Sequence, residues 1–176
     1  MNYSELKLFD VANGPGIRVT LYVSGCTHHC NGCFNTVTWD FNAGKPFDEA
    51  VMDKIVDAMK ASYIAGITIL GGEPFEYVNQ EGLLPLLKKV KETYPEKDVW
   101  CFTGYLFDKD IIDAMTKESP YTSELLKYID VIVDGPFIEE QRNLMLKFKG
   151  SENQRTIDVQ KSLEAGYVIE REGYES

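Results

Sequence analysis

The chain has 176 residues, of which 44% are hydrophobic, and a formal net charge of −10. That length suits one hydrophobic core and is short for two, and no run approaches the ~20 apolar residues of a membrane-spanning helix. The negative charge argues against nucleic acid as a partner, because binding a phosphate backbone requires clustered lysine and arginine side chains.

The first predicted strand covers residues 17–23, which are rich in β-branched and aromatic side chains. Three cysteines, Cys26, Cys30 and Cys33, follow this strand within eight residues. Only a tight loop can bring three sulfurs so spaced to one centre, and Gly25 and Gly32 give the backbone the freedom to form it. Three converging thiolates indicate a soft metal site. On an iron–sulfur cubane, three protein ligands leave one iron free to bind a small molecule.

Two other interpretations of the cysteines are weaker. A structural zinc site usually has four ligands in two separated pairs, and here His28 or His29 would have to be the fourth ligand from inside the same loop. A disulfide framework is not expected, because the start of the chain shows no export signal, and the chain is therefore predicted to be cytoplasmic. The spacing favours an iron–sulfur cluster. We interpret the two histidines as solvent-facing, and Cys101 as a buried, inert thiol.

Amphipathic helices alternate with further apolar strands along the rest of the chain. Asp48 is predicted to cap a helix that ends near residues 62–66, and a second helix covers residues 80–93, with Pro85 in its first turn or at a kink. Short helical pieces are expected at residues 111–115 and 123–128. Further strands are predicted at residues 67–70, 99–103 and 131–133, with a fifth at 154–159.

This alternation predicts an α/β fold, in which helices cover a mainly parallel sheet of about five strands, within a single domain that spans residues 1–176. A barrel of so few strands would stay open on one side, where a large partner could approach. Ligands of such folds bind at the carboxyl ends of the strands. One site should therefore collect the loops that follow the strands, namely the cysteines, Gly71-Gly72-Glu73-Pro74, Thr103-Gly104-Tyr105 and Asp134-Gly135-Pro136.

The cysteine spacing, together with Gly71-Gly72-Glu73-Pro74 after the next strand, resembles the radical S-adenosylmethionine superfamily. The resemblance implies a shortened (βα) barrel and a 4Fe-4S cluster on the three cysteines. It also implies S-adenosylmethionine as a second cofactor, which one electron cleaves to a 5′-deoxyadenosyl radical. Gly71 and Gly72 would let the backbone approach this ligand closely, and Glu73 would accept a charge-assisted hydrogen bond from the methionine ammonium. The alternative for Glu73 is an acidic residue that starts a helix.

Other segments narrow the resemblance to the activating proteins of anaerobic ribonucleoside-triphosphate reductase. These segments are residues 13–18, 23–26, 32–35, 100–105, 133–137 and 150–155. The resemblance implies an oxidoreductase that takes hydrogen from a glycine of that reductase and so generates its glycyl radical. It also implies a flavodoxin-type electron donor. A single cluster is expected, because the chain has no further groups of cysteines, and a homodimer is left open.

Two departures from the superfamily pattern concern ligand contacts. Many members have an aromatic residue just before the third cysteine, where this chain has Gly32, so adenine would contact the Gly32 backbone or Phe34. Activases for pyruvate formate-lyase carry an aspartate for a monovalent cation on the strand where this chain has Phe102 and Thr103, which leaves that cation site in doubt. Further candidate ligand contacts are Thr103, Tyr105, Asp134, Asn153 and Arg155. For these residues the alternative is a role in packing, in a turn or in a solvated loop.

Two other functions stay open at this level. A radical enzyme that acts on a small molecule would need a substrate pocket with polar groups of its own, for which little of the chain remains. A binding module without catalysis, holding an iron–sulfur cluster or zinc, would leave Gly71-Gly72-Glu73-Pro74 without a role.

Overall fold

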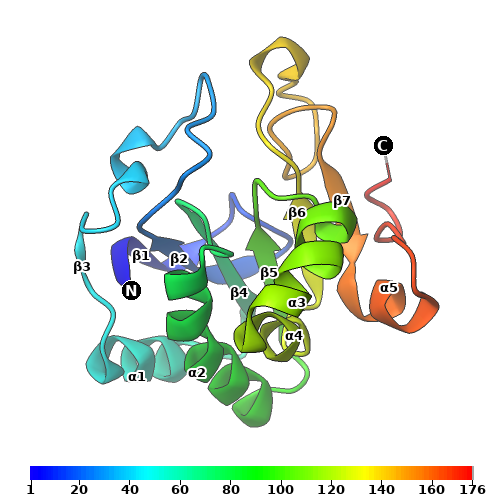
Figure 1. Ribbon diagram of the computed structural model, residues 1–176. Helices are drawn as coiled ribbons and strands as arrows, with labels where there is room; N and C mark the ends of the chain where they lie inside the picture. The colour runs from blue at the N-terminus through cyan, green and yellow to red at the C-terminus, as the bar shows by residue number, and fades with distance from the viewer. Residues whose placement is uncertain (176) are drawn as a thin grey trace.

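The structure, a computed structural model, describes residues 1–175. Its centre is an open, mixed sheet in the order β3-β1-β2-β4-β5-β6-β7 (Figure 1). The central strands β2, β4, β5 and β6 run parallel, whereas β1, β3 and β7 are antiparallel to their neighbours. The bounds are β1 (Asn2–Asp10), β2 (Ile17–Val23), β3 (Lys45–Pro46), β4 (Ile64–Gly71), β5 (Asp98–Phe102), β6 (Val131–Asp134) and β7 (Arg155–Asp158).

The sheet has seven strands within residues 1–175, so the prediction of about five is wrong. The four predicted strands that became β2, β4, β5 and β6 are confirmed, because each is a short apolar run buried on both faces. β1 escaped prediction because residues 2–9 all keep some exposure and include no apolar run, and β3 has only two residues. The fifth predicted strand is present as β7, but it runs antiparallel to β6.

Helices and turns of helix connect the strands. Asp48 caps α1 as predicted, since its carboxylate accepts a hydrogen bond from the Val51 backbone N–H at 3.0 Å. α2 begins three residues earlier than expected, so Pro85 lies in its interior rather than in its first turn. The bounds are α1 (Glu49–Ala58), α2 (Tyr77–Thr93), a π-helix η2 (Phe107–Met115), α3 (Thr116–Glu118), α4 (Pro120–Leu126) and α5 (Val159–Ala165), with short 3₁₀ turns η1 (Thr36–Trp39) and η3 (Glu139–Gln141).

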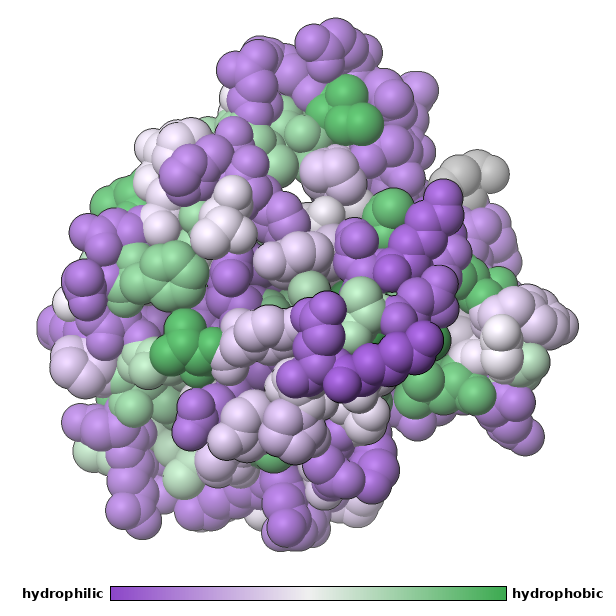
Figure 2. Space-filling model, in the orientation of Figure 1, coloured by the Kyte–Doolittle hydropathy of each residue, from purple (hydrophilic) through white to green (hydrophobic). Residues whose placement is uncertain are grey.

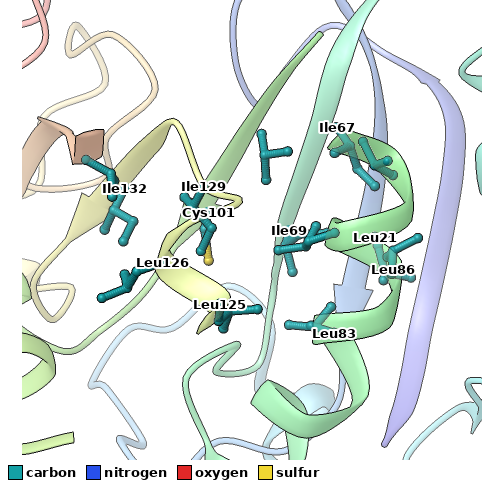
Figure 3. Packing of buried hydrophobic residues seen from close by; sticks show 14 of the residues in the cluster. Leu21, Ile67, Ile69, Leu83, Leu86, Cys101, Leu125, Leu126, Ile129 and Ile132 are labelled. Atoms are coloured by element: carbon teal, nitrogen blue, oxygen red, sulfur yellow. The ribbon is translucent and has the colours of Figure 1, made fainter. Parts of the chain in front are cut away.

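The main hydrophobic core lies between the sheet and the helices α1, α2, η2 and α4. Alternate residues of the parallel strands point toward these helices, as Figure 3 shows for Leu21, Ile69 and Ile132. Cys101 is buried in the same layer, which confirms its interpretation as a core residue. Burial of one such aliphatic side chain contributes about 1.5–3 kcal/mol. The core therefore fixes the parallel strands, and with them the edge at which the strands end.

Two long loops rise from that edge. Figure 1 shows them above the sheet, with the helices below and beside it. The cysteine loop, residues 24–44, follows β2, and the β6–β7 loop, residues 135–154, joins β6 to β7. Within the described residues, no helix is both long enough and apolar enough to cross a membrane.

Candidate functional site

A cavity of about 690 Å³ opens at the carboxyl ends of the parallel strands. This volume falls in the ~300–1,000 Å³ range of small-molecule sites. The cavity brings together the cysteines of the cysteine loop and the ends of β4, β5 and β6, as the strand order predicts. Lining residues that the sequence pointed to are Cys26, Cys30, Cys33, Phe34, Gly71, Gly72, Glu73 and Thr103.

The cysteine loop is held at its base by the backbone. The Gly25 N–H donates to the Thr38 carbonyl at 2.7 Å, and the Cys26 N–H donates to the Trp39 carbonyl at 3.2 Å. Gly25 has a φ of 101°, and a Cβ at this position would overlap the Phe41 ring. A glycine is therefore required where the chain turns into the cavity.

All three cysteines of this loop are free thiols, with Cys26 buried and the other two half-buried. Burial raises the pKa of the Cys26 thiol to about 11, although the backbone N–H of His28 opposes the shift. Without a cation the buried thiol is therefore protonated at neutral pH, and metal binding would displace its proton. Burial also raises the pKa of the Cys101 thiol well above its usual value, consistent with an inert thiol.

The histidines of the loop do not complete a zinc site. His28 Nε2 lies 2.7 Å from Glu73 Oε1, and its ring packs edge-on against Tyr105, with centroids 4.3 Å apart. His28 is therefore not solvent-facing, contrary to expectation. His29 remains exposed and stacks on Trp39. Among residues 1–175, no group of three or more His, Cys, Asp or Glu side chains is arranged to hold a single metal ion.

The residues present do fit a 4Fe-4S cluster. A cubane distributes three thiolates over three irons, so its ligands stand farther apart than the ligands of one zinc ion. Three free thiols that line one cavity are the donor set that such a cluster takes. The buried indole nitrogen of Trp39, which also lines the cavity, has no hydrogen-bond partner in the part of the chain that the structure describes. The indole N–H of Trp39 is therefore available to donate a hydrogen bond to a group that binds in the cavity.

Glu73 is the hub that joins three walls of the cavity. Its side chain is 0% exposed. Oε1 accepts hydrogen bonds from His28 Nε2 and the Gly104 N–H, both at 2.7 Å. Oε2 accepts from the Phe75 N–H at 2.8 Å and from Thr103 Oγ1 at 2.7 Å. These four donors use the acceptor positions of a carboxylate, so Glu73 fastens the end of β4 to the end of β5 and to the cysteine loop.

Gly71 and Gly72 serve the packing of the same strand end. A Cβ on Gly71 would lie 2.6 Å from the Val23 carbonyl oxygen, and one on Gly72 would lie 2.5 Å from the Gly25 carbonyl oxygen. Both distances are below normal van der Waals contact. The two glycines are therefore needed to seat β4 against β2 and the cysteine loop, which gives them a role that does not depend on a ligand.

The remaining predicted residues lie around the cavity rather than on its wall. Arg155 forms a two-pronged ion pair with buried Asp134, at 2.6 and 3.1 Å, and this pairing raises the pKa of the Arg155 guanidinium. Asn153 donates to the Pro136 carbonyl at 2.8 Å. Within residues 1–175, the predicted site residues that do not line the cavity are Gly32, Pro74, Tyr105, Asp134, Asn153 and Arg155.

Other parts of the cavity wall were not anticipated. Its floor carries Glu5, Asn13 and Tyr22, and Asn13 donates to the Tyr22 hydroxyl at 3.1 Å. The β6–β7 loop contributes Phe137, Gln154 and four residues between them. The Asn13-Gly-Pro-Gly sequence was a signal for the floor, because it predicts a turn, and the Asn13 carbonyl in that turn accepts a hydrogen bond from Thr68 Oγ1 of β4 at 2.8 Å.

The fold and the cavity define an α/β protein with three free cysteines at the carboxyl ends of its parallel strands, a donor set that fits an iron–sulfur cluster. Consistent with this, residues 12–157 match the family model of the 4Fe-4S single cluster domain. Three similar proteins are the anaerobic ribonucleoside-triphosphate reductase-activating proteins of Haemophilus influenzae, Enterobacteria phage T4 and Escherichia coli K12. The identities are 43%, 41% and 37%, each over 88% of this chain and over 96%, 92% and 96% of the relative. The chain belongs to this family of activating proteins, and the resemblance found in the sequence is confirmed.

Proposed function

We propose that this protein activates an anaerobic ribonucleoside-triphosphate reductase by generating a glycyl radical on it. The observation that carries the proposal is that the three free cysteines and the Gly71–Glu73 strand end face one cavity in a member of this family. With 4Fe-4S and S-adenosylmethionine bound, one electron would cleave the sulfonium, and the 5′-deoxyadenosyl radical would take hydrogen from a glycine of the reductase. The chain would then be a single radical S-adenosylmethionine domain, with the open sheet as its partial barrel.

In this proposal the cysteines hold the cluster, and the ends of β4 and β5 hold the methionine part of S-adenosylmethionine. Glu73 offers its negative charge to the methionine ammonium. Because its acceptor positions are filled, the ammonium must displace one donor. His28 is the easiest to displace, since it lies on the cysteine loop with its side chain 18% exposed, while the other donors are backbone N–H groups or a buried hydroxyl. Phe34 and the Gly32 backbone remain the proposed adenine contacts.

The proposed partners follow from the family and the cavity. The relatives are named as activating proteins of the reductase, so the proposed substrate is a glycine of a large protein that reaches the cavity from outside. A flavodoxin-type donor would supply the electron. Free cysteines suit a reducing cytoplasm, which is the proposed location.

A radical enzyme for a small-molecule substrate is the second candidate. It is favoured by the polar cavity floor of Glu5, Asn13 and Tyr22, which are groups that could hold such a substrate. Family membership favours the reductase.

Anaerobic reconstitution with iron and sulfide separates the two candidates. The proposed function predicts the absorption and electron paramagnetic resonance signals of a 4Fe-4S cluster. The protein without reductase should form 5′-deoxyadenosine slowly. When the reductase is added, the amount of 5′-deoxyadenosine should equal the amount of activated reductase. Rapid turnover on a free metabolite, unaffected by the reductase, would favour the small-molecule enzyme.

A further inference from the structure

The β6–β7 loop presents two apolar side chains to solvent. Leu144 is 82% exposed and Met145 is 90% exposed. The loop is closed below them, because the Glu152 N–H donates to the Gln141 carbonyl at 2.9 Å. Asn143 shapes the tip, since its Oδ1 accepts from the Met145 N–H at 2.9 Å. The two exposed side chains therefore lie on a turn that hydrogen bonds hold in place.

The cysteine loop presents a matching pair. Phe34 is 73% exposed and Val37 is 67% exposed. The two loops touch, with the Phe34 and Phe137 ring centroids 5.7 Å apart and the Arg142 guanidinium 5.1 Å from the Phe34 ring centroid. The four exposed residues Phe34, Val37, Leu144 and Met145, here called the rim, thus lie on the two loops that wall the cavity. Figure 2 shows hydrophobic side chains among the hydrophilic surface of the upper lobe, which the β6–β7 loop forms.

The loop that carries Leu144 and Met145 also differs in charge from the rest of the molecule. Residues 141–151 include Arg142, Lys147 and Lys149 and no acidic residue, and the flanking Glu139, Glu140 and Glu152 balance these charges, whereas the whole chain carries a net charge of −10. An exposed apolar surface on a loop without net negative charge suits a partner segment that carries apolar side chains, and acidic side chains of that segment would meet less repulsion there than elsewhere on this acidic protein.

We infer that the rim is the docking surface for the reductase segment that carries the target glycine. This inference rests on the proposed function, because only a protein substrate needs a binding surface outside the cavity. The segment is extended, with apolar side chains against the rim and acidic side chains beside Lys147. A second copy of this chain is the less suitable occupant, because it would cover the opening through which the glycine must enter.

The test is the affinity of the reconstituted protein for anaerobic ribonucleoside-triphosphate reductase, measured by calorimetry without oxygen. The double variant Leu144→Ser/Met145→Ser should bind at least about tenfold more weakly than the wild type. Leu163→Ser, an exposed leucine on α5, is the matched control and should bind within about twofold of the wild type. Iron content and circular dichroism check that each variant is folded and loaded. If the double variant fails these checks, Met145→Glu replaces it, because that side chain makes little contact with the fold.

The outcomes separate this inference from the proposed function. Equal affinity of the rim variants and the wild type overturns the docking surface while leaving the activation intact. A wild type that neither binds the reductase nor activates it overturns the proposed function instead. If the rim variants lose self-association in sedimentation experiments and keep reductase affinity, the rim is an interface between copies of this chain, and the inference is wrong.

Discussion

The Glu73 hub makes a sharp prediction for Glu73→Gln. The amide keeps the shape of the carboxylate but replaces one acceptor by an NH₂ donor. His28 can present an unprotonated ring nitrogen to that donor, and Thr103 can turn its hydroxyl hydrogen away so that its oxygen accepts. The backbone N–H groups of Gly104 and Phe75 cannot become acceptors. Whichever way the amide is oriented, one of these two N–H groups faces another donor inside the protein.

The cost can be estimated from this geometry. A buried unpaired N–H costs about 1–3 kcal/mol, and bonds to a charged acceptor are stronger than bonds to an amide. We expect Glu73→Gln to lower the free energy of unfolding of the apoprotein by about 2–3 kcal/mol. For a chain of this size that loss lowers the melting temperature by about 4–12 °C. Affinity of the loaded protein for S-adenosylmethionine should fall by about 1.5–3 kcal/mol as well.

Glu76→Gln is the matched control on the same strand-to-helix turn. Its Oε1 accepts both bonds from Thr27, at 3.0 and 2.7 Å, and these bonds are exposed, so an amide oxygen can keep them. A change within about 0.5 kcal/mol is expected in urea unfolding. If Glu73→Gln is as stable as this control, the hub argument is refuted. If it is destabilised but binds S-adenosylmethionine normally, Glu73 organises the fold and does not contact the cofactor.

Three further predictions concern the cysteines, an ion pair and a glycine. Alanine at any of the three loop cysteines should abolish the 4Fe-4S electron paramagnetic resonance signal, whereas Cys101→Ala should keep it; retention in the first group would mean that the ligands are misassigned. Arg155→Ala leaves buried Asp134 without its cation and should cost about 2–3 kcal/mol in urea unfolding, less than a fully buried pair because the arginine is partly exposed. Gly25→Ala should reduce iron loading in reconstitution, while Gly166→Ala, also at positive φ but with open space around it, should load normally; equal loading would show that the turn into the cavity tolerates a side chain.

Prediction from sequence succeeded where the signal was local. The parallel strands are short apolar runs, and the cysteine loop and the strand end at Gly71–Glu73 are recognised by residues a few positions apart. β1 was missed because its side chains are partly exposed and include no apolar run, and β7 was given no direction because direction depends on how the long β6–β7 loop returns.

The site was predicted as a set of loops but not as a network. The partners of Glu73 at Thr103 and His28 lie 30 and 45 residues away, and such distant pairs leave no pattern in a single sequence. For the same reason His28 was interpreted as solvent-facing, and Asp134 and Arg155 were considered separately although they form one ion pair. The chemistry of a motif is readable from residue types, whereas the contacts that fill its hydrogen bonds depend on the folded chain.

The central claim is that this protein places a radical on a glycine of its partner. The most direct measurement is electron paramagnetic resonance on an anaerobic mixture of the reduced, cluster-loaded protein, S-adenosylmethionine and anaerobic ribonucleoside-triphosphate reductase. We predict a glycyl radical doublet that disappears when the target glycine of the reductase is replaced by alanine. Absence of the doublet with a competent reductase, together with 5′-deoxyadenosine formation that depends on a free metabolite, would contradict the claim.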